Sequence, residues 1–403
     1  MKTLHVSLFL AIRSLLRGNY GIAAATTLMM LLIYVSLLFL PSLIQGAVNR
    51  VNAQLVNTLT SDIVITPVTK AASIDDAGAY LAKIRQTPGV AQATAVYRVG
   101  TQVSYGDNNS GSWTVDAIDP ATYGQVFTTP SNTFEGRALN SSDTSGVLLG
   151  IGIAGADQTS LRGYKASLQT VRAGDKVGIT LTTGKTSTFT VVGIYDNQFP
   201  LSDDDAYITM AEAEKLVPGS SDHATAIYVK TSSGADVNQV AQRLSPLRSG
   251  MKFETSEDLG TTVEDQVATF NLISDILKII SLAMAAITIF IITYIDLVNK
   301  RRQIGIERAI GIRSAPIVIS YVIKACAYAL AGIGGGFLLF KYAITPAVSQ
   351  HPFHFPNGPV TLATTWGETI RDLVILIIVA VFAALAPSLR SVHIKILDAI
   401  WGI

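Results

Sequence analysis

Four long apolar runs constrain this chain of 403 residues more than any other feature. They cover residues 21–44, 271–297, 317–343 and 370–388. Each approaches or exceeds the roughly 20 apolar residues that an α-helix needs to cross about 30 Å of hydrocarbon. A mean hydropathy of +0.40 with 15% charged residues agrees with bilayer segments. The sequence therefore predicts a polytopic α-helical membrane protein with four transmembrane helices.

The first run has two interpretations, a membrane anchor or a cleaved signal peptide. A signal peptide carries an apolar core of about 7–15 residues and a small-x-small exit. The apolar core within residues 21–44 is longer and lacks a convincing exit of that kind. We therefore expect an anchor. Residues 1–20 before it place apolar side chains at helical spacing, which favours either a helix lying along the inner membrane interface or an extension of the first span.

Orientation follows from the basic residues, because short loops rich in Lys and Arg stay in the cytoplasm. Basic residues precede the first span, fill the loop between spans two and three, and follow the fourth: Lys2, Arg13, Arg17, Lys300, Arg301, Arg302, Arg308, Arg313, Arg390 and Lys395. Both termini are thus expected in the cytoplasm. Residues 46–267, expected outside, carry 16 Lys and Arg against 23 Asp and Glu, whereas the remainder carries 14 against 6.

Residues 46–267 predict a large extracytoplasmic mixed α+β domain inserted between helices 1 and 2. Segments with strand character alternate with turn signals, at 62–66, 93–100, 113–118, 177–183, 187–196 and 226–231. Helical patterns lie at 76–86, 211–217 and 235–245. A domain of about 220 residues is large enough to bury a real core, which we expect to form two lobes. Helical stalks at 48–59 and 256–270 would join it to spans one and two.

Motifs for catalysis or metal binding are weak. The glycine pattern at 150–155 fits a dinucleotide fingerprint, but we interpret it as a strand end passing into a helix, because dinucleotides are scarce outside the cell. The run Asp203–Asp205 lacks the remaining spacing of a calcium loop, and His351 and His354 have no third ligand nearby in the sequence. Cys326 is the single cysteine. The chain also lacks a Walker-type loop and a nucleophile elbow, so we expect no catalytic residue, no metal and no cofactor on it.

Residues 299–315, NKRRQIGIERAIGIRSA, place five basic side chains and one carboxylate between two apolar spans. A short helix here would show an apolar face and a cationic face. Three interpretations remain open on these residues alone: a helix that docks in a groove of another protein, an interfacial helix held by anionic lipid, or a topogenic charge cluster.

The stretch RRQIGIERAIGIRSAPIVISYVIKACAYALAGIGGGF resembles the signature of the FtsX/MacB-type permease family of ABC transporters, which includes lipoprotein extractors. PGVAQATAVYR, RAGDKVGITL, FTVVGIYD, AYIT and the closing LAPSLRSVHIKILDAIWGI resemble the periplasmic core and C-terminal tail of that family. The resemblance covers essentially the whole chain, and it also agrees with the order of one span, a large outer domain and three further spans.

The resemblance implies a non-catalytic permease subunit in a prokaryotic cell membrane. Its expected partners are a separate ABC ATPase that binds ATP and Mg, a second copy or a homologous permease, membrane lipids, and a membrane fusion protein or extracytoplasmic lipoprotein, but no nucleic acid. The loop helix would be the coupling helix that sits in a cleft of the ATPase. By position its contact residues would be Arg301, Arg302, Ile304, Gly305, Ile306, Glu307, Ala309, Ile310 and Gly311.

The resemblance and the apolar runs together give the expected organisation. In chain order it comprises a cytoplasmic interfacial helix (1–20), transmembrane helix 1 (21–45), the MacB-like core domain with helical stalks (46–267), transmembrane helix 2 (268–298), the coupling-helix loop (299–315), transmembrane helix 3 (316–343), an extracytoplasmic loop (344–369), transmembrane helix 4 (370–389) and a cytoplasmic tail (390–403).

Two features of span three bear on helix packing. Many relatives carry a glutamate where this chain has Lys324. A lysine within a span costs roughly 3 kcal/mol unless it snorkels or is paired, so we expect it to snorkel to the interface or to pair with Asp296. The second feature is a set of small residues that allow a neighbouring helix to approach closely, namely Gly332, Gly334, Gly335 and Gly336.

Three functions are compatible with these features of the sequence. The first is an ATP-driven permease that exports or extracts an amphiphile, a peptide or a lipoprotein. The second is a mechanotransmission regulator of an outer partner such as a cell-wall hydrolase, without transport. The size of the outer domain favours the first over the second. The third, a membrane-anchored enzyme, has no constellation of residues to support it.

Overall fold

The computed structural model describes residues 2–16, 20–69, 73–106, 109–155, 167–182, 184–355 and 358–392. Arg17 and Lys395, both used above to predict orientation, lie outside these ranges, as do residues 393–403 of the expected tail. The chain divides into two compact units. The helical unit comprises Met1–Val48, Gln266–Phe353 and Val360–Ile403, and the sheet unit comprises Asn49–Asp265 and His354–Pro359.

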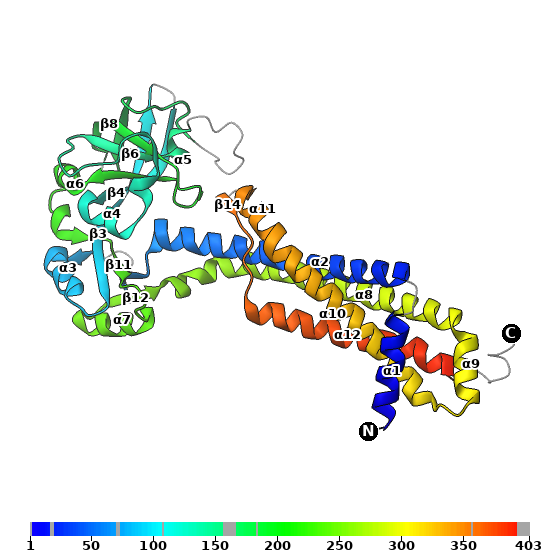
Figure 1. The fold of residues 1–403 in the computed structure, drawn as a ribbon. Coiled ribbons are helices and arrows are strands. Elements are labelled where there is room, and N and C mark those ends of the chain that lie inside the picture. Colours follow the sequence, from blue (N-terminus) through cyan, green and yellow to red (C-terminus); the bar gives the residue numbers. More distant parts are fainter. Residues whose placement is uncertain are drawn as a thin grey trace. The chain divides into compact units, whose positions relative to one another are not determined.

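Long helices dominate the first unit. They are α1(Lys2–Leu16), α2(Tyr20–Gln54), α8(Ser256–Asn299), α9(Arg301–Ala309), α10(Ser314–Leu339), α11(Thr345–Gln350) and α12(Trp366–Val392), with a π-helical segment at Phe340–Ile344 (Figure 1). The end of α2, the π-helical segment Leu55–Thr60 that follows it and the start of α8 belong to the sheet unit. Within the described residues, four helical stretches have the length and apolar composition needed to cross a membrane: Tyr20–Thr60, Asn271–Asn299, Ser314–Gln350 and Trp366–Arg390. The prediction of four such helices is confirmed.

Small side chains form much of the interior of the helical unit. Ala285 of α8, Ala329 of α10 and Ala380 of α12 are fully buried in one cluster, against Met30 and Tyr34 of α2. Small residues let helix backbones approach closely, which is how helices pack where lipid removes the hydrophobic driving force. Many of the large apolar side chains of these helices therefore lie on the outside of the unit.

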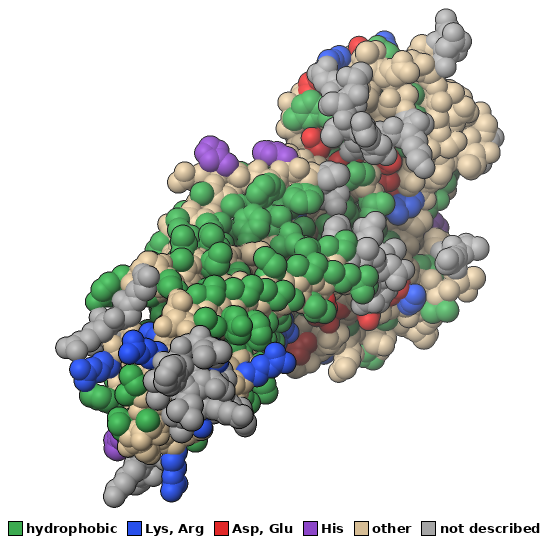
Figure 2. All heavy atoms as spheres, turned by 90° about the vertical axis from the view of Figure 1, so that its right-hand side faces the viewer, with side chains coloured by type: hydrophobic (Ala, Val, Ile, Leu, Met, Phe, Trp, Pro, Cys, Tyr) green, Lys and Arg blue, Asp and Glu red, His purple; other side chains and the backbone are tan. Residues whose placement is uncertain are grey.

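The outside of the same helices is apolar as well. On α8, Ile279 is 66% exposed and Met284 is 56% exposed. Figure 2 shows hydrophobic side chains covering the visible face of the helical unit, with Lys and Arg gathered at one end of it. Apolar surface on this scale suits hydrocarbon rather than water.

Strands make up most of the second unit. They are β1(Ile63–Pro67), β2(Ile74–Asp75), β3(Val90–Tyr105), β4(Asn109–Ile118), β5(Thr133–Gly136), β6(Gly146–Gly150), β7(Lys176–Leu181), β8(Thr186–Tyr195), β9(Asp205–Thr209), β10(His223–Ala224), β11(Ala226–Thr231) and β12(Met251–Thr255). The helices between them are α3(Ala77–Arg85), α4(Pro120–Val126), α5(Ile151–Ala154), α6(Met210–Leu216) and α7(Val237–Leu244). A short pair, β13(Phe353–Phe355) and β14(Gly358–Val360), follows α11 in the chain.

Six strands of this unit close on themselves. Around the ring, β3 pairs with β4, β4 with β9, β9 with β6, β6 with β8, β8 with β7, and β7 again with β3. The closing contact is antiparallel and sets Thr101 opposite Leu181 and Val103 opposite Ile179. The inward side chains of the ring belong to one buried cluster that includes Val115, Val177 and Phe189. This arrangement is a small β-barrel, which the sequence patterns did not predict.

The other end of β3 belongs to an open layer. There the strand order is β12-β1-β11-β3, and the register pairs Ile63 with Val229 and Tyr228 with Thr94. Helices α3 and α7 cover this layer through a separate apolar cluster containing Ile84 and Leu244. The unit therefore has two lobes that share β3, and its mixed α/β character agrees with the sequence.

The barrel lobe contains a buried acidic site. Asp116 on β4 is 3% exposed and accepts two hydrogen bonds from Arg98, at 2.8 and 2.7 Å. Asp205 begins β9 one strand away. Burial and then the Asp116 carboxylate raise the pKa of Asp205 to about 7, with Asp204 and Asp203 adding to the shift and Arg98 opposing it.

A consequence for stability follows from that raised pKa. An unfolded aspartate releases its proton near pH 3.8, whereas the folded site holds it to about pH 7, so stability falls as pH rises through this window. We expect Asp205→Asn to stabilise the barrel at pH 8 by about 2–4 kcal/mol, at 1.36 kcal/mol per pKa unit. Hydrogen exchange of the β9 amides, corrected for intrinsic exchange rates, measures this change in the stability of the barrel. The exposed Asp222→Asn is the control, and wild-type protection that grows from pH 5 to 8 would contradict the prediction.

Candidate functional site

Helix α9 lies in the basic loop between two long helices. Its C-terminal end is a Schellman motif, in which Ile312 N donates to Glu307 O and Gly311 N donates to Arg308 O, both at 3.1 Å. Gly311 has a φ of +96°, a left-handed conformation that favours glycine. The sequence AIGIRSA therefore stops one helix and starts the next within a few residues, as Figure 1 shows between α9 and α10.

One face of α9 packs against its own unit. Ile304 is 5% exposed and joins an apolar cluster with Leu297, Ile317 and Tyr321. Gly305 beside it is also buried. The resemblance placed both residues among the contacts for a partner. In the structure both are buried, and the Ile304 side chain packs against α10 and the end of α8. Their side of α9 is already covered within this chain.

The opposite face of α9 is open. Arg302, Ile306 and Ile310 follow one another at intervals of four residues and are all exposed, Ile306 at 49% and Ile310 at 74%. We call these three residues the α9 stripe. Ala309 and Gly311 are exposed as well, while Arg301 and Glu307 are half-buried. Glu307 accepts a hydrogen bond from Gln303 at 2.9 Å. The α9 stripe thus exposes two isoleucine side chains and one guanidinium on the surface of the unit.

Beside α9 the structure brings Asp296 and Lys324 together. Lys324, on α10, is 7% exposed, and its Nζ lies 2.5 Å from Asp296 Oδ2 at the end of α8. Lys300 Nζ lies 3.4 Å from the other oxygen of the same carboxylate. Both lysines also donate to Ser14 Oγ of α1, at 3.2 and 2.8 Å. The geometry is that of a paired lysine rather than one that snorkels.

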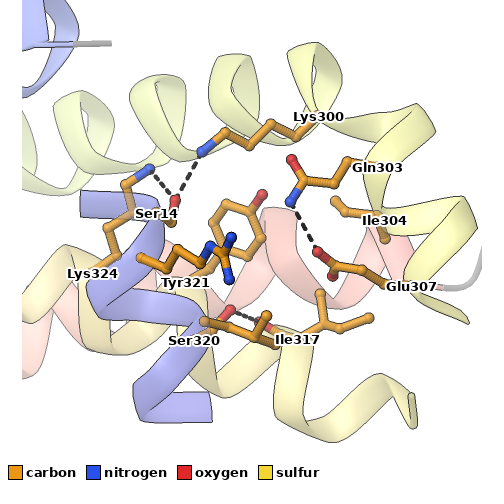
Figure 3. Close-up of a pocket in the computed structure, with 11 residues that line it drawn as sticks. Ser14, Lys300, Gln303, Ile304, Glu307, Ile317, Ser320, Tyr321 and Lys324 are labelled. Carbon is orange, nitrogen blue, oxygen red and sulfur yellow. Dashed lines mark hydrogen bonds between the residues drawn. The ribbon is translucent and has the colours of Figure 1, made fainter. Parts of the chain in front are cut away.

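A cavity of about 270 Å³ adjoins this polar cluster. Figure 3 shows that its walls come from α1, α9, α10 and the residue that joins α8 to α9, with Lys300 and Lys324 directed at Ser14. Sequence reasoning missed Ser14, because a serine on a short apolar helix carries no signal until the packing of α1 against α10 is known.

The glycines of α10 face α2 in two cases and open space in another. A Cβ at Gly332 would lie 2.5 Å from Met30 Cβ, and one at Gly336 would lie 3.0 Å from Leu31 O. A Cβ at Gly335 would meet only the Leu31 side chain, at 3.1 Å. A Cβ at Gly334 would have nothing within 4 Å. Close packing of α10 on α2 therefore depends on Gly332 and Gly336.

This difference supplies a matched pair of variants. Gly332→Ala should push α10 away from α2 and destabilise the bundle by about 1–3 kcal/mol, the usual cost of overpacking. Gly334→Ala, two residues along the same helix, should be neutral or slightly stabilising, because alanine has the higher helix propensity. The unfolding midpoint in detergent measures both. Equal midpoints for the two variants would contradict the packing role.

The remaining sequence candidates have structural explanations or stand apart. Gly150 ends β6, where a Cβ would lie 2.0 Å from Asp203 O, so the glycine allows close approach as expected. Asp203 is fully buried, and its two carboxylate oxygens accept backbone N–H bonds from Asn197 and Phe199. His351 follows α11, and His354 lies in β13. Within the described residues, no three His, Cys, Asp or Glu side chains gather as a metal site.

Four apolar helices joined to a folded mixed α/β unit fit the class of multi-pass membrane proteins. Comparison with known families then identifies the particular family. Residues 23–247 match the MacB-like periplasmic core domain, and residues 276–396 match the FtsX-like permease C-terminal domain. The chain belongs to the FtsX/MacB-type permease family.

Individual relatives are more distant. The macrolide export ATP-binding/permease protein MacB 2 of Aeromonas hydrophila is 30% identical over 129 residues, which are 30% of this chain and 20% of that protein. An uncharacterized ABC transporter permease of Methanocaldococcus jannaschii is 21% identical over 66% of this chain and 65% of its own length. The chain thus spans less than two thirds of each relative. This chain is also similar to the crystal structure of the periplasmic region of MacB from Actinobacillus actinomycetemcomitans. The match covers 51% of this chain and 93% of the crystallised chain, at 14% identity and a TM-score of 0.38.

Proposed function

We propose that this chain is the permease subunit of an ABC transporter, driven by ATP hydrolysis in a separate ATPase subunit. The conformational change driven by ATP hydrolysis would reach the MacB-like unit, which in this proposal lies outside the membrane between helices 1 and 2. The cargo would be an amphiphile, a peptide or a lipoprotein that is exported or extracted. ATP and Mg would bind only to the ATPase, and this chain would supply no catalytic residue.

The observation that carries the proposal is the geometry of α9. A helix that transmits motion from an ATPase needs one face packed against the membrane helices and another face available to the ATPase. Ile304 attaches α9 to α10, whereas Ile306 and Ile310 of the α9 stripe are exposed. An apolar stripe with spacing i, i+4 on a short helix is what a groove on a partner protein recognises. Family membership supports an ATPase as that partner.

The proposal also includes a topology and an assembly. Basic residues on α9 and near both ends of the chain support a cytoplasmic position for them in a prokaryotic cell membrane. Two permeases, identical or homologous, would work with two ATPases. A membrane fusion protein or a lipoprotein would be an outer partner. No observation favours the alternative of a regulator that transports nothing.

Affinity purification tests the proposal directly. The full chain, tagged and expressed in the organism that encodes it, should co-purify with an ABC ATPase in about equal amount. The complex in liposomes should hydrolyse ATP, and the chain alone should not. Purification without an ATPase, or labelling of an Arg302→Cys variant from outside the cell, would refute the proposal.

A further inference from the structure

The cavity beside α9 is lined by cations from three segments. Arg13 comes from α1, Lys300 from the junction between α8 and α9, and Lys324 from α10. Among the described residues that line it, Glu307 is the one carboxylate. The cavity volume of about 270 Å³ is far larger than a water molecule requires. Its positive lining points to an anionic occupant.

In the part of the chain that the structure describes, the nearby carboxylates do not neutralise this lining. Asp296 lies between Lys300 and Lys324, at 3.4 and 2.5 Å, so one carboxylate serves two ammonium groups. Within the described residues, the Arg13 guanidinium has no carboxylate partner and lies 5.8 Å from the ring of Phe9. Counting Asp296 and Glu307 against the three cations leaves one positive charge in excess.

The cavity also offers hydrogen-bond donors and an apolar wall. Ser14 already accepts from both lysines, so its own hydroxyl hydrogen remains available to an anion in the cavity. Tyr321 lines the same space. Leu10, Ile304 and Ile317 provide the apolar part. Arg and Lys side chains with hydroxyl donors form the usual environment of a bound phosphate.

The surface next to the cavity indicates where the phosphate comes from. Phe9, one turn before Arg13 on α1, is 60% exposed, and Ile12 beside Arg13 is 47% exposed. A free phosphate ion gains nothing from exposed phenylalanine and isoleucine. A phospholipid would place its acyl chains against them while its headgroup entered the cavity, as basic pockets between membrane helices do.

We propose that this cavity binds the phosphate of an acidic phospholipid, with Arg13, Lys300 and Lys324 as the cationic ligands. The bound headgroup bridges α1, α9 and α10, so it fixes the position from which the α9 stripe is presented. Only that last consequence rests on the proposed function. Binding itself requires no ATPase.

Lipid retention on the purified full chain tests the proposal. In nanodiscs of phosphatidylglycerol and phosphatidylcholine, followed by native mass spectrometry, the wild-type chain should retain phosphatidylglycerol. The double variant Arg13→Gln, Lys300→Gln should retain it at least fivefold less, and phosphatidylcholine alone should give no such retention. The matched control replaces two exposed cations outside the cavity, Lys341→Gln and Arg390→Gln, and should behave as wild type.

A second measurement separates the lipid from the free ion. Acetylation of Lys300, followed by peptide mass spectrometry, should slow at least fivefold in phosphatidylglycerol nanodiscs. Millimolar inorganic phosphate in phosphatidylcholine nanodiscs should protect far less. Protection by inorganic phosphate alone would assign the cavity to the free ion and overturn the lipid. Equal retention by the double variant would overturn the site, whereas failure to co-purify an ATPase would touch only the proposed function.

Discussion

Replacing Ile310 with aspartate should strongly reduce the stimulation of ATP hydrolysis that we propose this chain exerts on an ATPase subunit. Ile310 is 74% exposed at the end of the α9 stripe, so the substitution leaves the fold of the helical unit unchanged. In a complex the new carboxylate would be buried in an apolar groove without a partner. That costs at least about 2 kcal/mol, and such a loss weakens binding roughly thirtyfold. Hydrolysis by the reconstituted complex and co-purification of the ATPase should fall together.

Two further variants make this test specific. Val68→Asp places the same charge at an exposed apolar residue of the sheet unit, and it should leave stimulation intact. Gly305→Pro should also uncouple the two subunits, but by removing a backbone hydrogen bond inside α9. Full stimulation by Ile310→Asp would show that the stripe is not the docking surface.

Asp296→Asn should destabilise the helical unit by about 3–5 kcal/mol, the usual result of leaving one member of a buried ion pair alone. Lys324 is 7% exposed and would lose the carboxylate that balances its charge, keeping only neutral acceptors such as Ser14 Oγ and the amide oxygen of the new side chain. Lys324→Met should cost less, because Asp296 would still have Lys300 at 3.4 Å. Thermal unfolding midpoints in detergent give the order of the two variants.

The double variant measures the pairing itself. Asp296→Asn combined with Lys324→Met removes both charges, so it should recover most of the stability that Asp296→Asn loses. Lys341→Met, an exposed lysine of the same unit, controls for the loss of a charge. Purely additive effects in the double variant would mean that the two residues do not stabilise one another.

Long apolar runs predicted the membrane helices well, because a bilayer imposes one length and one composition on any helix that crosses it. The sequence also predicted a short helix in the basic loop, although it did not predict that the left-handed residue Gly311 ends this helix. The assignment of α9 to a partner remains a prediction. What the pattern did not distinguish was the two faces of α9, because Ile304 and Ile306 differ only in which of them meets α10.

The sheet unit was less predictable for a different reason. Alternation identifies strands one at a time, and it found those at 62–66 and 226–231 almost to the residue. Closure of the barrel depends on β7 meeting β3 about 75 residues away, and loop-closure free energy carries no local signature. In the same way, β6 is buried at every position, so GVLLG shows no alternation at all.

Because β3, β4, β9, β6, β8 and β7 complete a circuit, a pull on any one of them is shared by hydrogen-bonded neighbours on both sides. We therefore expect the closed barrel to move as a rigid body, because no strand of it can separate without breaking hydrogen bonds on both of its sides. In the described sheet, only β12 and β5 end the strand order. A partner that adds its own strand to this sheet is therefore expected to attach beside β12 or β5.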